Sequence, residues 1–217
     1  MKLNDRLDYS QEMSPRRRKA EDAEVFAALV RVMHRRGPAE LTLREIAAEA
    51  GVTAGALVQR FGSKRAMLLA HARSAAATGD VGLTTPPLRS KSPLTVLRSV
   101  AAMYAQLAGT PRAAVRNLGY LLNDLADSAL RRHLLRLSNG ARLWYEQQIS
   151  AAVAEGELHA ATDVQRLARS IEVTLRGSVL TWTLYRRGRS ADWLRADLDA
   201  VLSPYQSQPN RRPRRRS

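Results

Sequence analysis

The chain has 217 residues, with 35 lysines and arginines against 20 aspartates and glutamates, and it contains no cysteine. This length allows one domain or two modest ones, and the lack of cysteine excludes disulfides and zinc–thiolate sites. The net charge of +15 favours a polyanionic partner, either nucleic acid or an anionic membrane face.

Other composition features narrow the class further. The four histidines have no carboxylate or second histidine at metal-ligand spacing, so we expect no metal and no cofactor. No stretch reaches the roughly 18 apolar residues of a membrane span, and the amino terminus lacks the apolar run of a signal peptide. We therefore expect a cytoplasmic protein with no membrane partner. Aromatic residues are few and no window alternates as a strand does, which predicts an all-α fold.

The first predicted elements form an amino-terminal domain at residues 16–78, after a flexible arm at 1–15. A helix is expected to begin near Arg16, after Pro15, and to end at Gly37-Pro38. Three short helices follow at 43–50, 54–60 and 64–77. The apolar residues of the first helix recur at helical spacing: Val25, Phe26, Leu29, Val30 and Met33.

The segment after Thr42 has the pattern of a helix-turn-helix. Thr42 and Glu45 form a capping box, in which the hydroxyl accepts from the Glu45 amide and the carboxylate returns to the Thr42 amide. Gly51 permits a left-handed turn, and Thr53 caps the second helix. The apolar and small positions expected to pack the two helices together are also filled: Ile46, Ala47, Ala50, Val52 and Leu57.

The next helix begins with a residue that opposes the helix dipole. Phe61 is expected to anchor the end of the second helix, and Ser63 to cap the third. Lys64 then stands at a helix start, where a cation is unfavourable unless that end meets a phosphate.

The rest of the chain predicts a second, larger helical domain at residues 93–203, beyond a linker at 79–92 that contains Pro86-Pro87. Its helices are expected at 93–108, 111–125, 127–155, 163–186 and 191–202, with stops at Gly156, Gly188 and Pro204. Residues 204–217 are polar and arginine-rich, which predicts a disordered basic tail.

Residues 37–64, together with the weaker segment 25–33, resemble the TetR family of bacterial regulators. The resemblance covers about the first 80 residues, and further on only Gly156-Glu157-Leu158 is similar. It implies a DNA-binding domain, a helical ligand-binding domain, a homodimer, and repression relieved by a small molecule. The chain departs from the family at Met33, Pro38 and Val58, where aromatic residues are usual. Because the tyrosine commonly found at Val58 contacts DNA, the sequence read by this chain needs a different contact set.

The candidate DNA-binding residues divide by role. The exposed candidates on the recognition helix are Thr53, Ala54, Gly55, Val58 and Gln59, and Arg60 joins Gln59 and the cap residues in the DNA contact set. In the major groove Gln59 can pair with adenine, and Val58 or Ala54 can touch a thymine methyl group. The alternative is a solvated helix with a poor apolar face. The expected phosphate contacts are Thr42, Arg44, Thr53 and Lys64.

Basic segments outside the motif leave two interpretations open. Arg16, Arg17 and Arg18 either contact the DNA backbone or minor groove, or form a solvated helix start. The five arginines of the tail either bind DNA nonspecifically or have no role.

The second domain offers a ligand site and a dimer face. The pocket candidates are its polar and aromatic members: Tyr104, Asn123, Trp144, Gln148, Thr174 and Trp182. The last two helices are expected to pair across a two-fold axis through Ile171, Leu175, Val179, Leu198, Val201 and Leu202.

These features predict a sequence-specific regulator, with double-stranded DNA bearing a near-palindromic operator, a second copy and a small molecule as its partners. We do not expect an enzyme, because the sequence has no cysteine nucleophile, no cluster of histidines and carboxylates, and no phosphate-binding loop. The remaining alternative is an architectural DNA-binding protein that senses no ligand.

Overall fold

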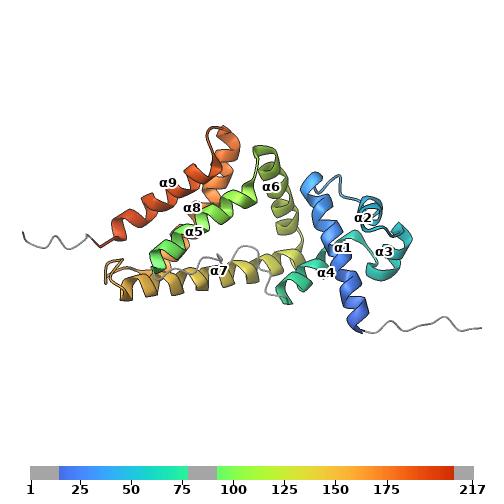
Figure 1. Cartoon of the computed structure of the whole chain (residues 1–217), viewed down its shortest axis with the longest axis horizontal. Coiled ribbons are helices and arrows are strands. Elements are labelled where there is room, and N and C mark those ends of the chain that lie inside the picture. Colours follow the sequence, from blue (N-terminus) through green and yellow to red (C-terminus); the bar gives the residue numbers. More distant parts are fainter. Residues whose placement is uncertain (1–14, 78–91, 208–217) are drawn as a thin grey trace, which may run out of the picture. The chain divides into compact units, whose positions relative to one another are not determined.

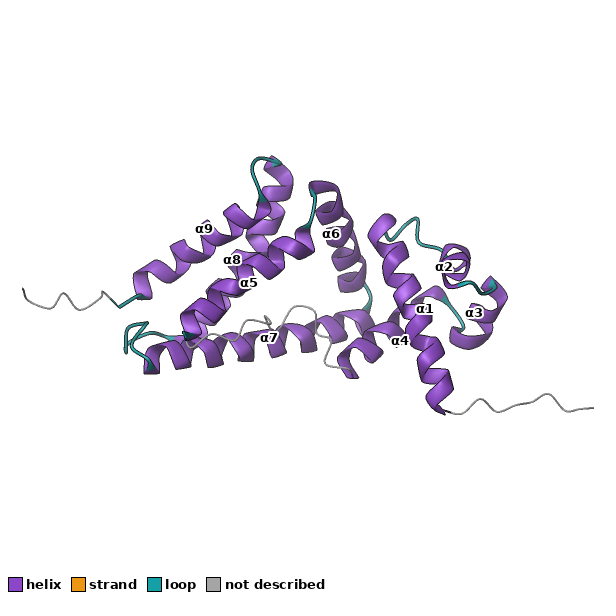
Figure 2. Ribbon diagram, viewed as in Figure 1, coloured by secondary structure: helices purple, strands orange, loops and turns teal. Residues whose placement is uncertain are grey.

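The computed structural model of the chain describes residues 15–77 and 92–207, with the side chains of 15–20 and 76–77 left out. Within these ranges all regular structure is helical apart from one isolated bridge, which confirms the all-α prediction (Figure 1 and Figure 2). The helices are α1 (Pro15–Arg35), α2 (Leu43–Ala50), α3 (Ala54–Phe61), α4 (Lys64–Ala77), α5 (Pro93–Ala108), α6 (Pro111–Ala126), α7 (Ser128–Ala154), α8 (Val164–Tyr185) and α9 (Ser190–Leu202), followed by the 3₁₀ helix η1 (Ser203–Tyr205).

The chain divides into two compact units between His71 and Ala72. This boundary lies inside α4, whereas the sequence placed the end of the first domain at residue 78. The first two turns of α4 belong to the first unit because Met67 is fully buried there. Residues 64–71 of α4 therefore belong to the first unit and residues 72–77 to the second.

The core of the first unit is formed by one face of α1 and the inner faces of α2, α3 and α4. Val30 and Met33 of α1, which were expected in this core, are only half-buried, and Val32 takes the inward position. The buried apolar residues of the unit are Val25, Phe26, Ala28, Leu29, Val32, Leu41, Ile46, Ala47, Leu57 and Met67.

The core of the second unit lies among α5, α7, α8 and α9, with α9 running alongside α5 and α8 (Figure 1). Four residues expected at the dimer face, Ile171, Leu175, Leu198 and Leu202, are fully buried in this core. The prediction for these four is wrong, because they hold α8 and α9 within one subunit. A second, smaller cluster joins Trp182 of α8 to Ala108 of α5 and Ala114 of α6.

The end of α9 is tied to the α7–α8 loop. The His159 amide donates to the Tyr205 carbonyl at 2.8 Å, and the Ser207 amide donates to the Glu157 carbonyl at 3.1 Å. Leu158 and Gln206 form an isolated antiparallel bridge. Residues 204–207 are therefore structured, and the predicted start of the disordered tail at 204 is too early. Residues 208–217 lie outside the described part of the chain, as do the arm at 1–14 and residues 78–91 of the expected linker.

Two further properties of the described residues concern the kinds of site that they can form. None of these helices is both long and apolar enough to cross a membrane. The described residues also hold no group of three or more histidine, aspartate or glutamate side chains that are placed to bind a metal.

Candidate DNA-binding site

Hydroxyl side chains begin the three short helices of the first unit. The Thr42 hydroxyl accepts from the Glu45 amide at 3.2 Å, and the Thr53 hydroxyl accepts from the Ala56 amide at 3.1 Å. Ser63 caps α4 in the same way through the Ala66 amide, as expected. Each cap satisfies an amide that would otherwise lack a partner in its helix, and fixes where that helix starts.

The capping box at Thr42 is only half formed. The Glu45 carboxylate accepts from the Thr42 hydroxyl at 3.2 Å and pairs with Arg36 Nε at 3.0 Å. The sequence predicted a return bond from this carboxylate to the Thr42 amide. The carboxylate is paired instead with Arg36, the residue directly after α1.

The turn between α2 and α3 follows the expected geometry with one exception. Gly51 has φ 70° and ψ 26°, the left-handed conformation that favours glycine. The Val52 amide then donates to the Ala47 carbonyl at 2.9 Å, which closes α2. The Val52 side chain is 41 % exposed, so it does not fill the turn as predicted. Leu57, 1 % exposed, provides the packing between the two helices.

The outer face of α3 presents small and apolar groups. Thr53, Gly55, Val58 and Gln59 are exposed, and Ala54 is half-buried. Ala56 is exposed as well, although the sequence did not single it out. The surface therefore carries one amide side chain, at Gln59, among groups suited to close apolar contact.

Arg60, expected to face DNA, is bound within the unit. Its Nη1 lies 3.2 Å from Glu21 Oε2, and its Nε lies 2.7 Å from Asp22 Oδ1. Its guanidinium also lies over the Phe61 ring, 5.8 Å from the centroid. Arg60 thus fixes α3 against α1, while Phe61 adds a ring contact with Phe26 at 5.8 Å.

Lys64 also has partners within the chain. Its Nζ donates to the Leu41 carbonyl at 2.9 Å and to the Pro38 carbonyl at 3.4 Å. These two bonds give the lysine a structural reason to stand at a helix start, which the sequence did not supply. One of its three ammonium donors remains for a phosphate.

Arg44 is the predicted phosphate contact with the fewest interactions within the described part of the chain. It lies on the exposed side of α2 and has no hydrogen-bond or ion-pair partner among the described residues. Arg16, Arg17 and Arg18 fall in the first turn of α1, and their side chains lie outside the described set.

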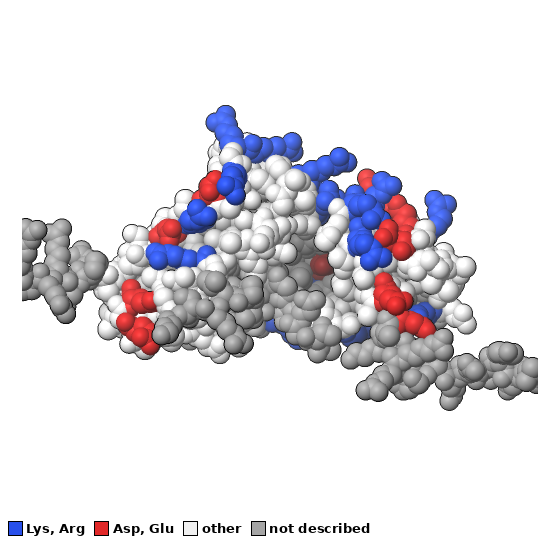
Figure 3. Space-filling model, in the orientation of Figure 1, with Lys and Arg blue, Asp and Glu red and all other residues white. Residues whose placement is uncertain are grey.

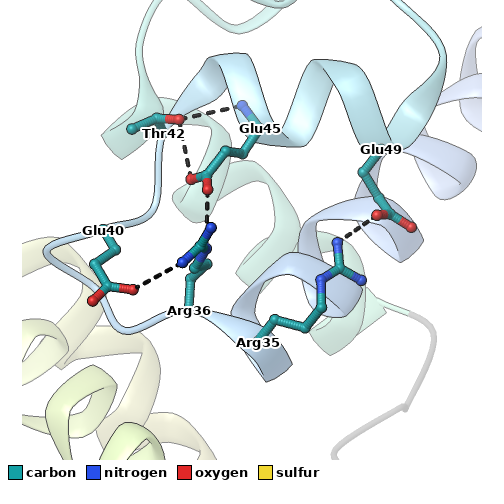
Figure 4. A network of polar contacts seen from close by, with 6 residues as sticks. All are labelled: Arg35, Arg36, Glu40, Thr42, Glu45 and Glu49. Atoms are coloured by element: carbon teal, nitrogen blue, oxygen red, sulfur yellow. Dashed lines mark hydrogen bonds and ion pairs between the residues drawn. The ribbon is translucent and has the colours of Figure 1, made fainter.

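An ion-pair network joins the end of α1 to α2 (Figure 4). Arg31 Nε donates to Glu49 at 2.6 Å, and Arg35 also bonds this carboxylate. Hydrogen bonds from Arg31 and then Arg35 lower the pKa of Glu49 below its ordinary value of 4.5. Arg36 pairs with Glu45 and, at 3.7 Å, with Glu40. This network was not predicted from the sequence, although basic residues four apart on α1 and acidic residues four apart on α2 were a signal for it.

Because of this network, the surface of the first unit is not uniformly basic. In Figure 3, basic and acidic side chains lie next to one another on the face shown. Glu45 and Glu49 of α2 are paired with Arg36 and with Arg31 and Arg35, whereas Arg44 of α2 has no acidic partner among the described residues.

The six pocket candidates of the second unit do not converge on one cavity. Tyr104 and Trp144 belong to the α5–α7 core, whereas Trp182 packs in the separate cluster with Ala108 and donates from Nε1 to the Gly188 carbonyl at 3.2 Å. Asn123 is exposed and bonds Asp124. Gln148 is half-buried, and so is Thr174, which lines an open surface hollow with Arg166, Arg169, Ser170, Val173 and Val201.

Comparison with protein families matches both units. A model described as bacterial regulatory proteins, tetR family, matches residues 25–71. A model described as tetracyclin repressor-like, C-terminal domain, matches residues 123–198. A search of curated proteins found no matching sequence.

Solved structures share the fold over most of the chain. A TetR transcription regulator from Haloarcula marismortui is 17% identical, with a TM-score of 0.70 over 87% of this chain and 99% of that chain. A putative TetR-family regulator from Rhodococcus sp. is 20% identical, with a TM-score of 0.63 over 86% and 98%. FadR from Bacillus subtilis, solved in complex with stearoyl-CoA, is 18% identical, with a TM-score of 0.61 over 83% and 97%. At these identities the likeness shows the fold.

Proposed function

Because the chain belongs to the TetR family of bacterial regulatory proteins, we propose that it is a repressor that binds a near-palindromic operator as a homodimer and is released by a small molecule. Members of this family regulate transcription by binding DNA and are not enzymes. The observation that carries the proposal is the capped helix-turn-helix, whose second helix exposes Thr53, Gly55, Val58 and Gln59.

Base reading is assigned to the exposed face of α3. Gln59 pairs with an adenine edge, and Val58 and Ala54 contact thymine methyl groups. Thr53 and Gly55 allow close approach of the DNA backbone. Arg60 acts through position, because its ion pairs with Glu21 and Asp22 hold α3 on α1.

Phosphate contact is assigned mainly to α2 and the start of α1. Thr42 and Arg44 lie at the amino end of α2, where amides and a cation both favour an anion. Lys64 offers its remaining donor at the start of α4. Arg16, Arg17 and Arg18 extend the contact along the backbone or into the minor groove.

The dimer is assigned to an exposed apolar stripe on α8. Val173, Leu180 and Leu184 are 63%, 56% and 76% exposed, and their spacing of seven and four places them on one face of the helix, with Gly177 between them. Large apolar side chains exposed in a row mark an interaction surface. This stripe replaces the buried residues that the sequence suggested.

The small molecule is assigned to the second unit, which is larger than DNA reading requires. The Bacillus subtilis FadR structure, solved with stearoyl-CoA, shares this fold and supports a ligand for the helical unit. Typical coupling of 1–3 kcal/mol would weaken operator binding about 5- to 150-fold, and DNA would weaken the ligand by the same factor. An architectural DNA-binding protein, the second candidate, would show no such coupling.

Selection of bound duplexes from random DNA tests the proposal. The purified protein should enrich two-fold related half-sites about one helical turn apart, or a multiple of it. Gln59→Ala should relax preference at one position in each half-site, at a cost of about 1–3 kcal/mol. Gln147→Ala, an exposed glutamine on α7, is the matched control. Enrichment of only asymmetric sites would refute binding as a homodimer. An equal loss of affinity for operator and random DNA in Gln59→Ala would refute base reading by Gln59.

A further inference from the structure

The turn between α8 and α9 carries three exposed arginines. Arg186, Arg187 and Arg189 have no acidic partner among the described residues. The other charged groups nearby, Arg195 and Asp192 of α9, pair with each other at 3.9 Å. In the orientation of Figure 1, basic side chains project at the upper edge of Figure 3, where this turn lies. The positive charge of the three arginines is therefore not balanced within the described part of the chain.

Arg186 has a backbone conformation that arginine rarely adopts. It ends α8 with φ 53° and ψ 35°, in the left-handed region, and its amide donates to the Trp182 carbonyl at 2.8 Å. Among the described residues it is the one residue other than glycine with a positive φ. Glycine is usual at this position of a helix, because a Cβ makes the conformation unfavourable. Since glycine would satisfy the backbone with less strain, the arginine indicates a role for its side chain.

The start of α9 leaves hydrogen-bond donors unused. Its N-cap is Arg189, which makes no side-chain cap hydrogen bond. The Asp192 and Trp193 amides donate to the Arg189 carbonyl at 3.1 and 3.4 Å. The Ser190 and Ala191 amides, in contrast, have no acceptor among the described residues. Free amides and a cation at the positive end of a helix dipole favour an anion there.

A serine hydroxyl without a partner lies at the same end of α9. Ser190 is the first residue of the helix and is 9 % exposed, and its hydroxyl makes no hydrogen bond to the described residues. Side chains of an α-helix lean toward its amino terminus, so this hydroxyl points to the end at which the amides are free. Burial of an unbonded hydroxyl costs free energy, which a bound acceptor would recover. Hydroxyl, amide and guanidinium donors together are suited to a phosphate group.

Two tryptophans of the second unit hold this turn in place. Trp182 Nε1 donates to the Gly188 carbonyl at 3.2 Å, and the Trp182 ring packs with Ala108 and Ala114. Trp193 packs against the same cluster, and a Cβ at Gly188 would lie 3.6 Å from its Nε1. The three arginines are thus attached to a backbone that packs on the core, so binding of an anion does not require the backbone to become ordered.

We propose that the turn between α8 and α9 is a binding site for a small molecule that carries linked phosphate groups. One phosphate accepts from the Ser190 and Ala191 amides and from the Ser190 hydroxyl. The guanidinium groups of Arg186, Arg187 and Arg189 pair with the remaining oxygens. A single phosphate carries about 1.5 to 2 negative charges at neutral pH, fewer than three guanidinium groups balance, so a diphosphate fits the site better. The inference goes beyond the proposed function, because it requires neither operator binding nor operator release.

Titration calorimetry of the full-length protein with inorganic anions tests the chemistry. Pyrophosphate should bind more tightly than phosphate at the same ionic strength, because its additional charge pairs with further guanidinium groups. Equal affinity for the two anions, or no binding of pyrophosphate at millimolar concentration, would overturn the proposal.

A pair of arginine variants tests the position. Arg187→Gln should weaken pyrophosphate binding about two- to fivefold, the effect of one exposed ion pair. Arg132→Gln, at an exposed arginine of α7, removes the same charge from another helix and should leave the affinity unchanged. An equal loss in the two variants would show that binding follows the net charge of the protein, and would overturn the site.

Two further variants test whether the same residues serve only the fold. Ser190→Ala should weaken pyrophosphate binding about three- to tenfold and leave the melting temperature unchanged or higher, because the hydroxyl has no bond within the described chain to lose. Arg186→Gly should also weaken binding but raise the melting temperature, because glycine adopts the left-handed conformation without strain. Unchanged pyrophosphate affinity in both variants would assign the two residues to the fold alone and overturn the proposal.

Nucleic acid carries the same phosphate chemistry on a polymer, so binding to a random-sequence duplex separates the two sources. Arg187→Gln should leave the slope of log duplex affinity against log salt as it is in the unaltered protein. A slope lower by about 0.9 would assign Arg187 to a DNA phosphate and overturn a site for a small molecule. Neither measurement uses the operator, so failure to select an operator would refute the proposed function while this site stands.

Discussion

The exposed residues of α3 differ in whether the fold of the first unit requires them. Gly55 is exposed inside α3, and an added Cβ would meet nothing closer than Thr53 Oγ1 at 3.9 Å. The fold of the unit therefore does not require a glycine there. Glycine inside a helix lowers stability by about 1 kcal/mol relative to alanine, so its presence fits a surface that DNA approaches closely.

Gly55→Ala should raise the unfolding free energy of the protein by up to about 1 kcal/mol and lower its affinity for the operator. Thermal unfolding and operator titration measure the two effects. Gly140→Ala on α7, another exposed helical glycine with open space around it, should stabilise to a similar extent without any change in DNA binding. An operator affinity equal to that of the unaltered protein would show that α3 makes no close approach at residue 55.

Two cations near the start of α2 and α4 should respond differently to substitution. Arg44→Ala should weaken all duplexes alike and reduce the slope of log affinity against log salt by about 0.9, because the protein then neutralises one phosphate fewer, and it should leave the unfolding free energy unchanged. Lys64→Met should, besides losing its phosphate contact, lower the unfolding free energy by about 1 kcal/mol, because the carbonyls of Pro38 and Leu41 lose their donor. An unchanged slope for Arg44→Ala would remove it from the interface, and an unaltered stability for Lys64→Met would show that its two bonds contribute nothing measurable.

At the scale of elements, ion pairs decide how the short helices lie on α1. Arg60 connects α3 to the start of α1, and Glu49 connects α2 to its end. Helices of eight residues are too short to be stable alone, so their orientation depends on such contacts and on the shared core.

The Glu49 connection should make stability depend on pH in the acid range. Its pKa is lowered in the folded state, so its contribution is present above the ordinary value of 4.5 and disappears as the pH falls through the lowered pKa. The melting temperature of the unaltered protein should therefore fall more steeply below about pH 4.5 than that of Glu49→Gln. Glu24→Gln, an exposed acid of α1 without an arginine partner among the described residues, provides the control. Parallel curves for Glu49→Gln and the unaltered protein would contradict the assignment.

At the scale of the whole molecule, the α8 stripe should determine the oligomeric state. Leu180→Arg places a charge in the middle of the apolar row and should convert a dimer to a monomer, with loss of cooperative binding to paired half-sites. Leu143→Arg, at an equally exposed leucine of α7, should leave the dimer intact. Sedimentation of both variants measures the outcome, and a dimeric Leu180→Arg would move the interface elsewhere.

The basic end of the chain can be tested by truncation after Ser207, which keeps the hydrogen bond from Ser207 to Glu157 and removes five arginines. If these arginines touch phosphates, the salt slope should fall by up to roughly 0.9 for each arginine that neutralises a phosphate, and preference for the operator over random DNA should rise. A slope equal to that of the full chain would mean that the arginines do not contact DNA.

The sequence by itself determined where the helices of this protein lie along the chain and that α2 and α3 form a helix-turn-helix. Caps at Thr42, Thr53 and Ser63, a left-handed Gly51 and apolar periodicity are local signals, because they act within a few residues of the chain, and the observed helix ends agree with them.

Only the tertiary structure decided which side chains remain available for binding. Arg60 and Lys64 look like DNA ligands in the sequence, but partners 39 and 23 residues away occupy them. Ile171 and Leu198 look suited to a dimer face, yet they are buried because α8 packs on α9 within one subunit. Such contacts join residues distant in sequence, and local propensity carries no information about them.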